Sequence, residues 1–161
     1  EEYDTIDQYV KPDKNVYEFN FGMKRYVHEV VAETPTTPGT DLKEVLAINE
    51  IYFDYNSARI REDALVELQK VVAALKQYPN IHIAIRSHTD SRGKSDYNMK
   101  LSQERAKSTM DYLIKHEIGQ SRLSAKGFGE TQLVNDCGDN ANCTEEQHQK
   151  NRRTAFVVTQ L

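Results

Sequence analysis

Two oppositely charged side chains form the first candidate binding pair in the sequence. Asp90 lies in a polar segment directly after an alternating apolar run, so we expect it in the loop after the carboxyl end of a strand. Free backbone N–H groups and the helix dipole favour anions there, just before the next helix begins. Helical periodicity places Arg105 with Asn98 and Leu101 along the edge of that helix's apolar stripe, near the sheet. We therefore expect the loop to turn Asp90 back toward Arg105.

An Asp and an Arg held this close have two interpretations. The first is a structural salt bridge that holds the loop on the helix. The second is a receptor for a zwitterionic amino-acid head, in which Asp90 accepts hydrogen bonds from an ammonium group and Arg105 holds a carboxylate bidentately. Both can hold at once, because a ligand with one charge of each sign could insert between the two side chains.

Hydrolytic chemistry has weaker support. His88 stands two residues before Asp90, and Ser87 and Ser91 lie beside them. A nucleophilic serine needs a sharp, exposed turn with donors for the oxyanion, and the sequence has no Gly-x-Ser-x-Gly run. We expect His88 to be a hydrogen-bonding residue that anchors the loop.

The two cysteines allow three interpretations. Cys137 and Cys143 lie close together in a loop rich in Asn, Asp and Gly. In an oxidising compartment they would form a disulfide, worth about 2 kcal/mol on the chain-entropy model, whereas elsewhere they would be two thiols without a role. A zinc site would need four ligands, and His148 is the only histidine nearby, so we expect no metal centre.

Two further motifs help to define the site. The run Gly127-Phe128-Gly129-Glu130 lacks the Lys-Ser/Thr of a phosphate-binding loop, so we interpret it as a turn and expect no cofactor. Arg152 and Arg153 directly precede the last apolar strand. Strand alternation sends them to opposite faces, which leaves one of them free to reach a ligand.

The elements that must position these residues alternate between strand and helix patterns. The expected strands are 51–55, 81–86, 122–128 and 154–159, the amphipathic helices are 62–78 and 98–117, and a helical turn lies near 144–149. This order predicts an α/β fold, a two-layer sandwich in which a mixed sheet carries two long helices on one face.

The start of the chain differs in composition from the rest. An alternating aromatic run at 16–21 predicts a single strand, and the segment 34–45, which begins with a run rich in Thr and Pro, reads as a linker. We therefore expect an N-terminal segment at 1–33, a linker at 34–45 and the main domain at 46–161. The first segment is either the end of a preceding domain or an extension that lies on the main domain.

Charge and hydropathy exclude some partners. The 161 residues include 21 basic and 25 acidic side chains, and the resulting net charge of −4 argues against nucleic acid as the main partner. The longest apolar run, 71–75, is far shorter than the roughly 20 residues that span a bilayer, and no signal-peptide pattern opens the sequence. We expect no membrane span.

Several short motifs, in this order and at these distances, resemble one known family. They are Thr89-Asp90, Asn98-x-x-Leu101-Ser102-x-x-Arg105-Ala106, Gly127-Phe128-Gly129-Glu130 and Asn151-Arg152-Arg153. Together they resemble the C-terminal peptidoglycan-binding domain shared by outer-membrane protein A, the peptidoglycan-associated lipoprotein and the flagellar stator protein MotB. The resemblance covers about residues 46–161.

The resemblance implies a ligand site. In that family the Asp and Arg that match Asp90 and Arg105 bind the diaminopimelate of the peptidoglycan stem peptide. The matching Asn98, Asp54 and Arg152 are implied to be supporting contacts. The full predicted set of ligand-binding residues is Asp90, Arg105, Asn98, Asp54, Thr89, Leu101 and Arg152. One departure is Ser87, where the family usually has Gly before His-Thr-Asp.

The resemblance also implies a role. It predicts non-covalent binding of peptidoglycan through the meso-diaminopimelate stem peptide, in the oxidising periplasm, with no catalysis. An outer-membrane protein complex, reached through regions upstream of this segment, would thereby be anchored to the cell wall. The N-terminal segment and its Thr/Pro linker are similar to modular outer-membrane lipoproteins of Bacteroidota, including the PorE type associated with type IX secretion. The alternatives are a peptidoglycan hydrolase or amidase, and a structural interaction domain whose Asp90 and Arg105 form only a salt bridge.

Overall fold

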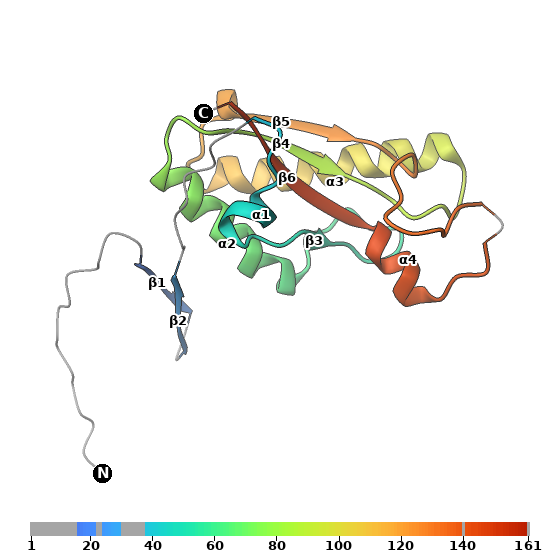
Figure 1. Ribbon diagram of the computed structural model, residues 1–161, viewed down its shortest axis with the longest axis horizontal. Coiled ribbons are helices and arrows are strands. Elements are labelled where there is room, and N and C mark those ends of the chain that lie inside the picture. The colour runs from blue at the N-terminus through green and yellow to red at the C-terminus, as the bar shows by residue number, and fades with distance from the viewer. Residues whose placement is uncertain (1–15, 22–23, 30–37, 140, 161) are drawn as a thin grey trace, which may run out of the picture.

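The computed structural model describes residues 16–21, 24–29, 38–139 and 141–160 (Figure 1). Strand β1 (Val16–Phe21) pairs antiparallel with β2 (Lys24–Glu29). The predicted strand at 16–21 is therefore present. The sequence analysis predicted a single strand in this part of the chain and did not predict β2.

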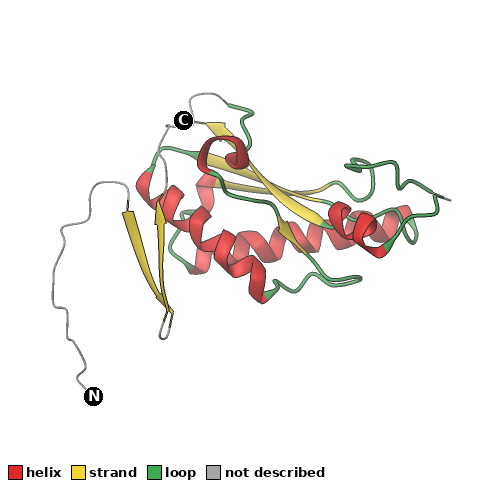
Figure 2. Cartoon of the chain, turned by 60° about the horizontal axis from the view of Figure 1, so that its bottom comes forward, coloured by secondary structure: helices red, strands yellow, loops and turns green. Residues whose placement is uncertain are grey.

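The main sheet has four strands in the order β3-β6-β4-β5. They are β3 (Ile51–Tyr52), β4 (His82–Ser87), β5 (Leu123–Gly127) and β6 (Arg153–Gln160). β4 and β5 run parallel, and β6 runs antiparallel to both β3 and β4, so the sheet is mixed. Helices α2 (Glu62–Gln77) and α3 (Ser95–Lys115) lie together on one face of this sheet (Figures 1 and 2). The predicted two-layer α/β architecture is confirmed.

The core lies between this sheet and its helices. Ile83 and Ile85 of β4 are fully buried, as the period of two predicted, and Leu68 of α2 and Leu113 of α3 pack into the same cluster. Each such side chain contributes roughly 1.5–3 kcal/mol when it leaves water. The apolar stripes therefore fix which side of each element faces the sheet.

The Gly-Phe-Gly-Glu motif is where α3 docks on β5. A Cβ atom at Gly127 would lie 2.3 Å from the backbone nitrogen of Gln103 and 2.5 Å from Oγ of Ser102. Ser102 Oγ also accepts a hydrogen bond from the backbone N–H of Gly129 at 2.8 Å. Only glycine allows this approach, which fixes the rotation of α3 and thereby the side chains it directs at the sheet.

The end of the predicted linker packs on the domain. Helix α1 (Leu42–Leu46), which the sequence analysis did not anticipate, places Leu42 and Leu46 in the core. The backbone of Gly39 and Thr40 exchanges hydrogen bonds with Val158 of β6, at 2.7 and 2.9 Å. Residues 39–46 therefore contact the sheet. The division of the chain into an N-terminal segment, a linker at 34–45 and a main domain stays a proposal.

Two predicted elements differ in length. β3 is confined to Ile51–Tyr52, whereas a strand through 55 was expected, because the chain then turns at 54–57 toward the site. The helical turn expected near 144–149 is helix α4 (Glu145–Asn151), which begins with a capping box between Thr144 and Gln147. Within the described ranges, no helix has the length and apolar character needed to cross a membrane.

Candidate functional site

A small cavity lies where the loops after β3 and β4, the start of α3 and the end of α4 meet. Its volume is about 60 Å³. Six of the predicted ligand-binding residues line it: Thr89, Asp90, Asn98, Leu101, Arg105 and Arg152. Segments that are far apart in the sequence thus contribute to one site.

Asp90 is a buried carboxylate held by two arginines. Its side chain is 4% exposed, and its Oδ2 accepts hydrogen bonds at 2.7 Å from both Arg92 Nη2 and Arg152 Nη1. Oδ1 accepts one hydrogen bond, from the backbone N–H of Arg92 at 3.1 Å. Burial raises the pKa of Asp90, but the hydrogen bonds from the two arginines outweigh it and hold the pKa below its usual value. Asp90 is therefore an anion at neutral pH.

Arg105 is fully buried and donates to main-chain carbonyls. Its Nε, Nη1 and Nη2 donate to the carbonyls of Ser57, His88 and Asp54, at 2.8, 3.0 and 3.1 Å respectively. Burial is the main reason that the pKa of Arg105 falls to about 10, and the nearby Arg152 lowers it further. The guanidinium still carries its charge at neutral pH.

The expected direct contact between Asp90 and Arg105 is wrong. Among the described residues, the ion pairs of Asp90 are with Arg92 and Arg152. The reason is that Arg105 is held by the carbonyls of the loops around it, while Arg152 reaches Asp90 from the end of α4, directly before β6. Because Asp90 and Arg105 do not form an ion pair, the interpretation of the two residues as a structural salt bridge is also wrong.

Arg152 is the second buried cation of the site. Its Nε donates to the carbonyl of Phe53 at 3.2 Å, and its Nη2 donates to Glu145 Oε1 at 2.6 Å and to Gln149. Arg153 instead pairs with Glu50 at 3.1 Å, away from the cavity. The two arginines do contact different groups, as expected, but Arg152 precedes the strand, so strand alternation is not the cause.

Asn98 and Thr89 play different parts at the cavity. Asn98 Nδ2 donates to the carbonyls of Asp90 and Arg92, at 3.3 and 3.1 Å, and to Glu130, so it holds the loop that carries Asp90. Thr89 is buried, and its hydroxyl has no hydrogen-bond partner among the described residues. An unsatisfied buried hydroxyl costs about 1–3 kcal/mol, which a bound ligand could recover.

Asp54 reaches the site through its backbone. Its carbonyl accepts from Arg105, whereas its carboxylate is exposed and pairs with Arg61 at 3.0 Å. That carboxylate lines a neighbouring hollow of about 430 Å³ together with Arg59 and Glu62.

Several residues of the site were not identified by the sequence analysis. Arg92 binds Asp90 and lies 4.6 Å above the ring of Tyr55, while Tyr97 joins Tyr55 at the exposed rim of the cavity. Arg92 and Tyr97 lie close to Asp90 in the sequence, and this proximity could have identified them as residues of the site. Glu145 pairs with both Arg92 and Arg152, and no local pattern marks it.

The histidine next to the site is not arranged for hydrolysis. His88 is buried and stacks on Phe128, and burial is the main cause that lowers its pKa to about 4. Ser87 Oγ is hydrogen-bonded to Thr154, and Ser91 Oγ donates to the carbonyl of Cys137. Neither hydroxyl is paired with the imidazole in the described structure.

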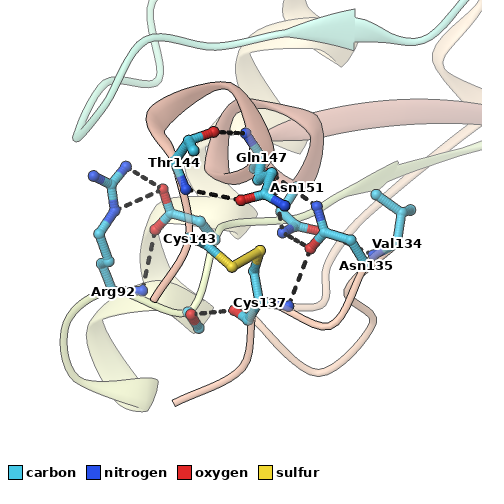
Figure 3. Close-up of a disulfide and its surroundings, with 10 residues drawn as sticks. Arg92, Val134, Asn135, Cys137, Cys143, Thr144, Gln147 and Asn151 are labelled. Carbon is cyan, nitrogen blue, oxygen red and sulfur yellow. Dashed lines mark hydrogen bonds and ion pairs between the residues drawn. A yellow bond between two sulfur atoms is a disulfide. The ribbon is translucent and has the colours of Figure 1, made fainter. Parts of the chain in front are cut away.

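Cys137 and Cys143 form a disulfide beside α4, which confirms the predicted pairing (Figure 3). A search of the described part of the chain finds no group of three or more His, Cys, Asp or Glu side chains that could hold a metal ion.

Comparison with known proteins agrees with this geometry. The model of the OmpA family matches residues 52–152, which include every residue that lines the cavity. This chain belongs to the OmpA family. One relative is the peptidoglycan-associated lipoprotein of Rhizobium meliloti. It is 33% identical over 123 residues, which cover 76% of this chain and 67% of the relative. Outer membrane porin F of Pseudomonas aeruginosa is 30% identical over 78% of this chain, but this match covers only 37% of the porin.

Solved structures of the OmpA family have the same fold. The peptidoglycan-associated lipoprotein from Burkholderia pseudomallei superimposes with a TM-score of 0.65 at 31% identity, over 71% of this chain and 92% of that protein. The cell wall anchor of the T6SS from Pseudomonas aeruginosa superimposes with a TM-score of 0.55 at 27% identity, over 68% and 76% of the two chains.

Proposed function

We propose that this chain binds peptidoglycan non-covalently and anchors an outer-membrane assembly to the cell wall from the periplasm. The observation that carries the proposal is the cavity itself, in which a buried carboxylate and two buried guanidinium groups surround a small space. Two of the relatives support it by name, one as a peptidoglycan-associated lipoprotein and one as a cell wall anchor. The disulfide is consistent with an oxidising compartment.

The ligand group that this cavity suits is the free amino-acid centre of diaminopimelate. Its ammonium would bind Asp90, whose Oδ1 accepts one hydrogen bond from the described residues and has a second lone pair for the ligand. Its carboxylate would bind Arg105, where the carbonyl contacts within the described ranges use one of the two N–H groups on each Nη. Arg152 adds positive charge beside that carboxylate. A dipolar ligand thus gains a partner for each of its charges.

The remaining predicted residues complete this binding mode. The unpartnered hydroxyl of Thr89 supplies a hydrogen bond to the ligand, and Leu101 offers an apolar surface to the methylene chain of diaminopimelate. Asn98 and the backbone of Asp54 hold the loop and the guanidinium in place. The exposed Tyr55 and Tyr97 lie at the rim, where the rest of the stem peptide would leave the cavity.

We propose binding without turnover. An amidase needs an activated nucleophile or a metal-bound water at the scissile bond. The serine hydroxyls beside His88 are engaged elsewhere, with Thr154 and with Cys137. This arrangement supports a binding module over the hydrolase alternative. The similarity to Bacteroidota lipoproteins of the PorE type stays a prediction, as does the identity of the anchored assembly.

Replacing Asp90→Asn tests the proposal with little change in shape. Loss of the charge-assisted contact to the ligand ammonium should weaken binding of a diaminopimelate-containing stem peptide about tenfold or more. Isothermal titration calorimetry measures the affinity, and co-sedimentation with insoluble peptidoglycan gives a second readout.

The matched control is Asp111→Asn, which removes an exposed carboxylate paired with Lys107 on the outer side of α3. It should bind like the wild type. Circular dichroism establishes that both variants are folded. Equal affinity of folded Asp90→Asn and wild-type protein would exclude Asp90 from the binding site.

A further inference from the structure

The disulfide is attached directly to the loop that carries Asp90. Ser91, the residue after Asp90, donates its hydroxyl hydrogen to the carbonyl of Cys137 at 2.5 Å, and both residues are buried. Figure 3 shows the disulfide below the start of α4, with Arg92 to its left and Asn135 to its right. The disulfide and the candidate binding loop therefore form one packed unit.

A second set of contacts ties the residues before the disulfide to α4. Asn135 Oδ1 accepts from the backbone N–H of Cys137 at 3.3 Å and from Asn151 Nδ2 at 2.7 Å, and Asn135 Nδ2 donates to the carbonyl of Gln147 at 2.8 Å. Asn151 Oδ1 accepts from the backbone N–H of Val134 at 2.8 Å (Figure 3). The chain before Cys137 is thus held to Gln147 and Asn151 of α4.

On the other side of the disulfide, Cys143 leads directly into the first turn of α4. Thr144 caps the helix, and the next residue is Glu145. Glu145 Oε2 accepts from Arg92 Nη1 at 2.9 Å, and Oε1 accepts from Arg152 Nη2 at 2.6 Å. The disulfide therefore lies two residues from a carboxylate that contacts both arginines of the site.

Four charges form a closed ring beside the cavity, which Asp90, Arg92 and Arg152 line. Arg92 and Arg152 each contact both Asp90 and Glu145. With Glu145 present, two positive and two negative groups balance. Without it, a ligand ammonium approaching Asp90 would meet two guanidinium groups that share a single carboxylate, and the surplus positive charge would repel it.

We propose that the Cys137–Cys143 disulfide and Glu145 form a positioning unit for the ligand site, in which the disulfide fixes the start of α4 and Glu145 balances Arg92 and Arg152. Asp90 is then able to accept a ligand ammonium. This inference rests on the proposed function. Glu145 acts through the arginines and is a positioning residue.

The test compares Glu145→Gln with Glu146→Gln. Both changes remove one acidic charge from the first turn of α4, but only Glu145 contacts the arginines. In calorimetric titration with the tripeptide L-Ala-γ-D-Glu-meso-diaminopimelate, Glu145→Gln should bind about fivefold more weakly than the wild type, while Glu146→Gln should bind equally well. The difference should shrink in about 1 M salt, because the effect is electrostatic.

Coupling to the disulfide is measured with the double variant Cys137→Ser, Cys143→Ser. It should show a loss of affinity similar to that of Glu145→Gln, and adding Glu145→Gln should produce little further loss, because both changes release the same contact. Fully additive losses would overturn the link between the disulfide and Glu145. If the double variant does not fold by circular dichroism, Ser91→Ala takes its place, since it cuts the hydrogen bond to Cys137 and keeps the disulfide.

The outcomes separate the two proposals. If the wild type binds the tripeptide and Glu145→Gln binds as well as Glu146→Gln, the positioning role is overturned and the proposed function stands. If the wild type does not bind the tripeptide, the proposed function fails, and this inference fails with it.

Discussion

At the scale of single residues, burial decides which groups keep their charge. Asp90 stays ionised because two arginines donate to it, and Arg105 stays protonated because its neighbours are carbonyl oxygens. His88 has no such support, so burial, with the charges of Arg153 and Arg86 adding to it, lowers its pKa to about 4. The site therefore holds fixed charges beside a neutral imidazole.

The neutral state of His88 predicts a pH dependence of stability. An unfolded histidine has a pKa near 6.5, so between about pH 6.5 and pH 4 the unfolded chain takes up a proton that the folded protein does not. The contribution of neutral His88 to the free energy of unfolding should therefore be present above about pH 6.5 and be lost as the pH falls toward 4. The loss due to His88 between pH 7 and pH 5 should be about 2 kcal/mol.

Urea denaturation of the wild type and of His88→Gln at both pH values measures this effect. The variant should lose about 2 kcal/mol less than the wild type between pH 7 and pH 5, whatever its absolute stability. His82→Gln, a change at a partly exposed histidine at the start of β4, is the control substitution. An identical pH dependence in His88→Gln would contradict the prediction.

At the scale of elements, the site depends on the close docking of α3 on β5. Asn98, Leu101 and Arg105 all lie on this helix, so its rotation and its distance from the sheet set their positions together. The backbone contact at Gly127 holds that distance. Packing of Gly127 on Ser102 and Gln103 thereby sets the positions of residues within about one helical turn of this contact.

Gly127→Ala should push α3 away from β5. The new methyl group would overlap the backbone of Gln103, which cannot move as a side-chain end can, so we expect a loss of about 2–3 kcal/mol in the free energy of unfolding. Affinity for the stem peptide should fall as well. Gly138→Ala is the matched control, since a Cβ there meets no atom within 4 Å. Equal stability of the two variants in urea denaturation would refute the docking role of Gly127.

At the scale of the whole molecule, the central strand β6 connects the parts of the site. It begins at Arg153, directly after Arg152, and its far end pairs with residues 39–41 ahead of α1. Because Leu42 and Leu46 lie in the core, the stable unit should begin near residue 38. We therefore propose that the stable unit folds without residues 1–37.

Two fragments test this boundary. Fragment 38–161 should match the 161-residue chain in melting temperature and in affinity for the stem peptide. Fragment 47–161 lacks Leu42 and Leu46, each worth roughly 1.5–3 kcal/mol, and should melt at a markedly lower temperature or fail to fold. A fragment 47–161 as stable as fragment 38–161 would place the boundary at the end of α1.

The sequence alone determined the main elements, their order and the loop that carries the site. Apolar periodicity is a local property, so it predicted α2, α3, β4, β5 and β6 to within a few residues. Helix α1 was missed because five residues are too few to show a period. β3 was predicted too long, since its apolar pattern continues where the chain already turns.

Only the tertiary structure decided which charges meet. Arg152 is 62 residues from Asp90, and Glu145 is 53 residues from Arg92, so their contacts depend on how β6 and α4 are placed beside the loop after β4. Ion pairs are set by distances across the fold, and side-chain types along the chain do not specify them. For this reason the sequence identified Asp90 and Arg105 as candidates but assigned Asp90 the wrong partner.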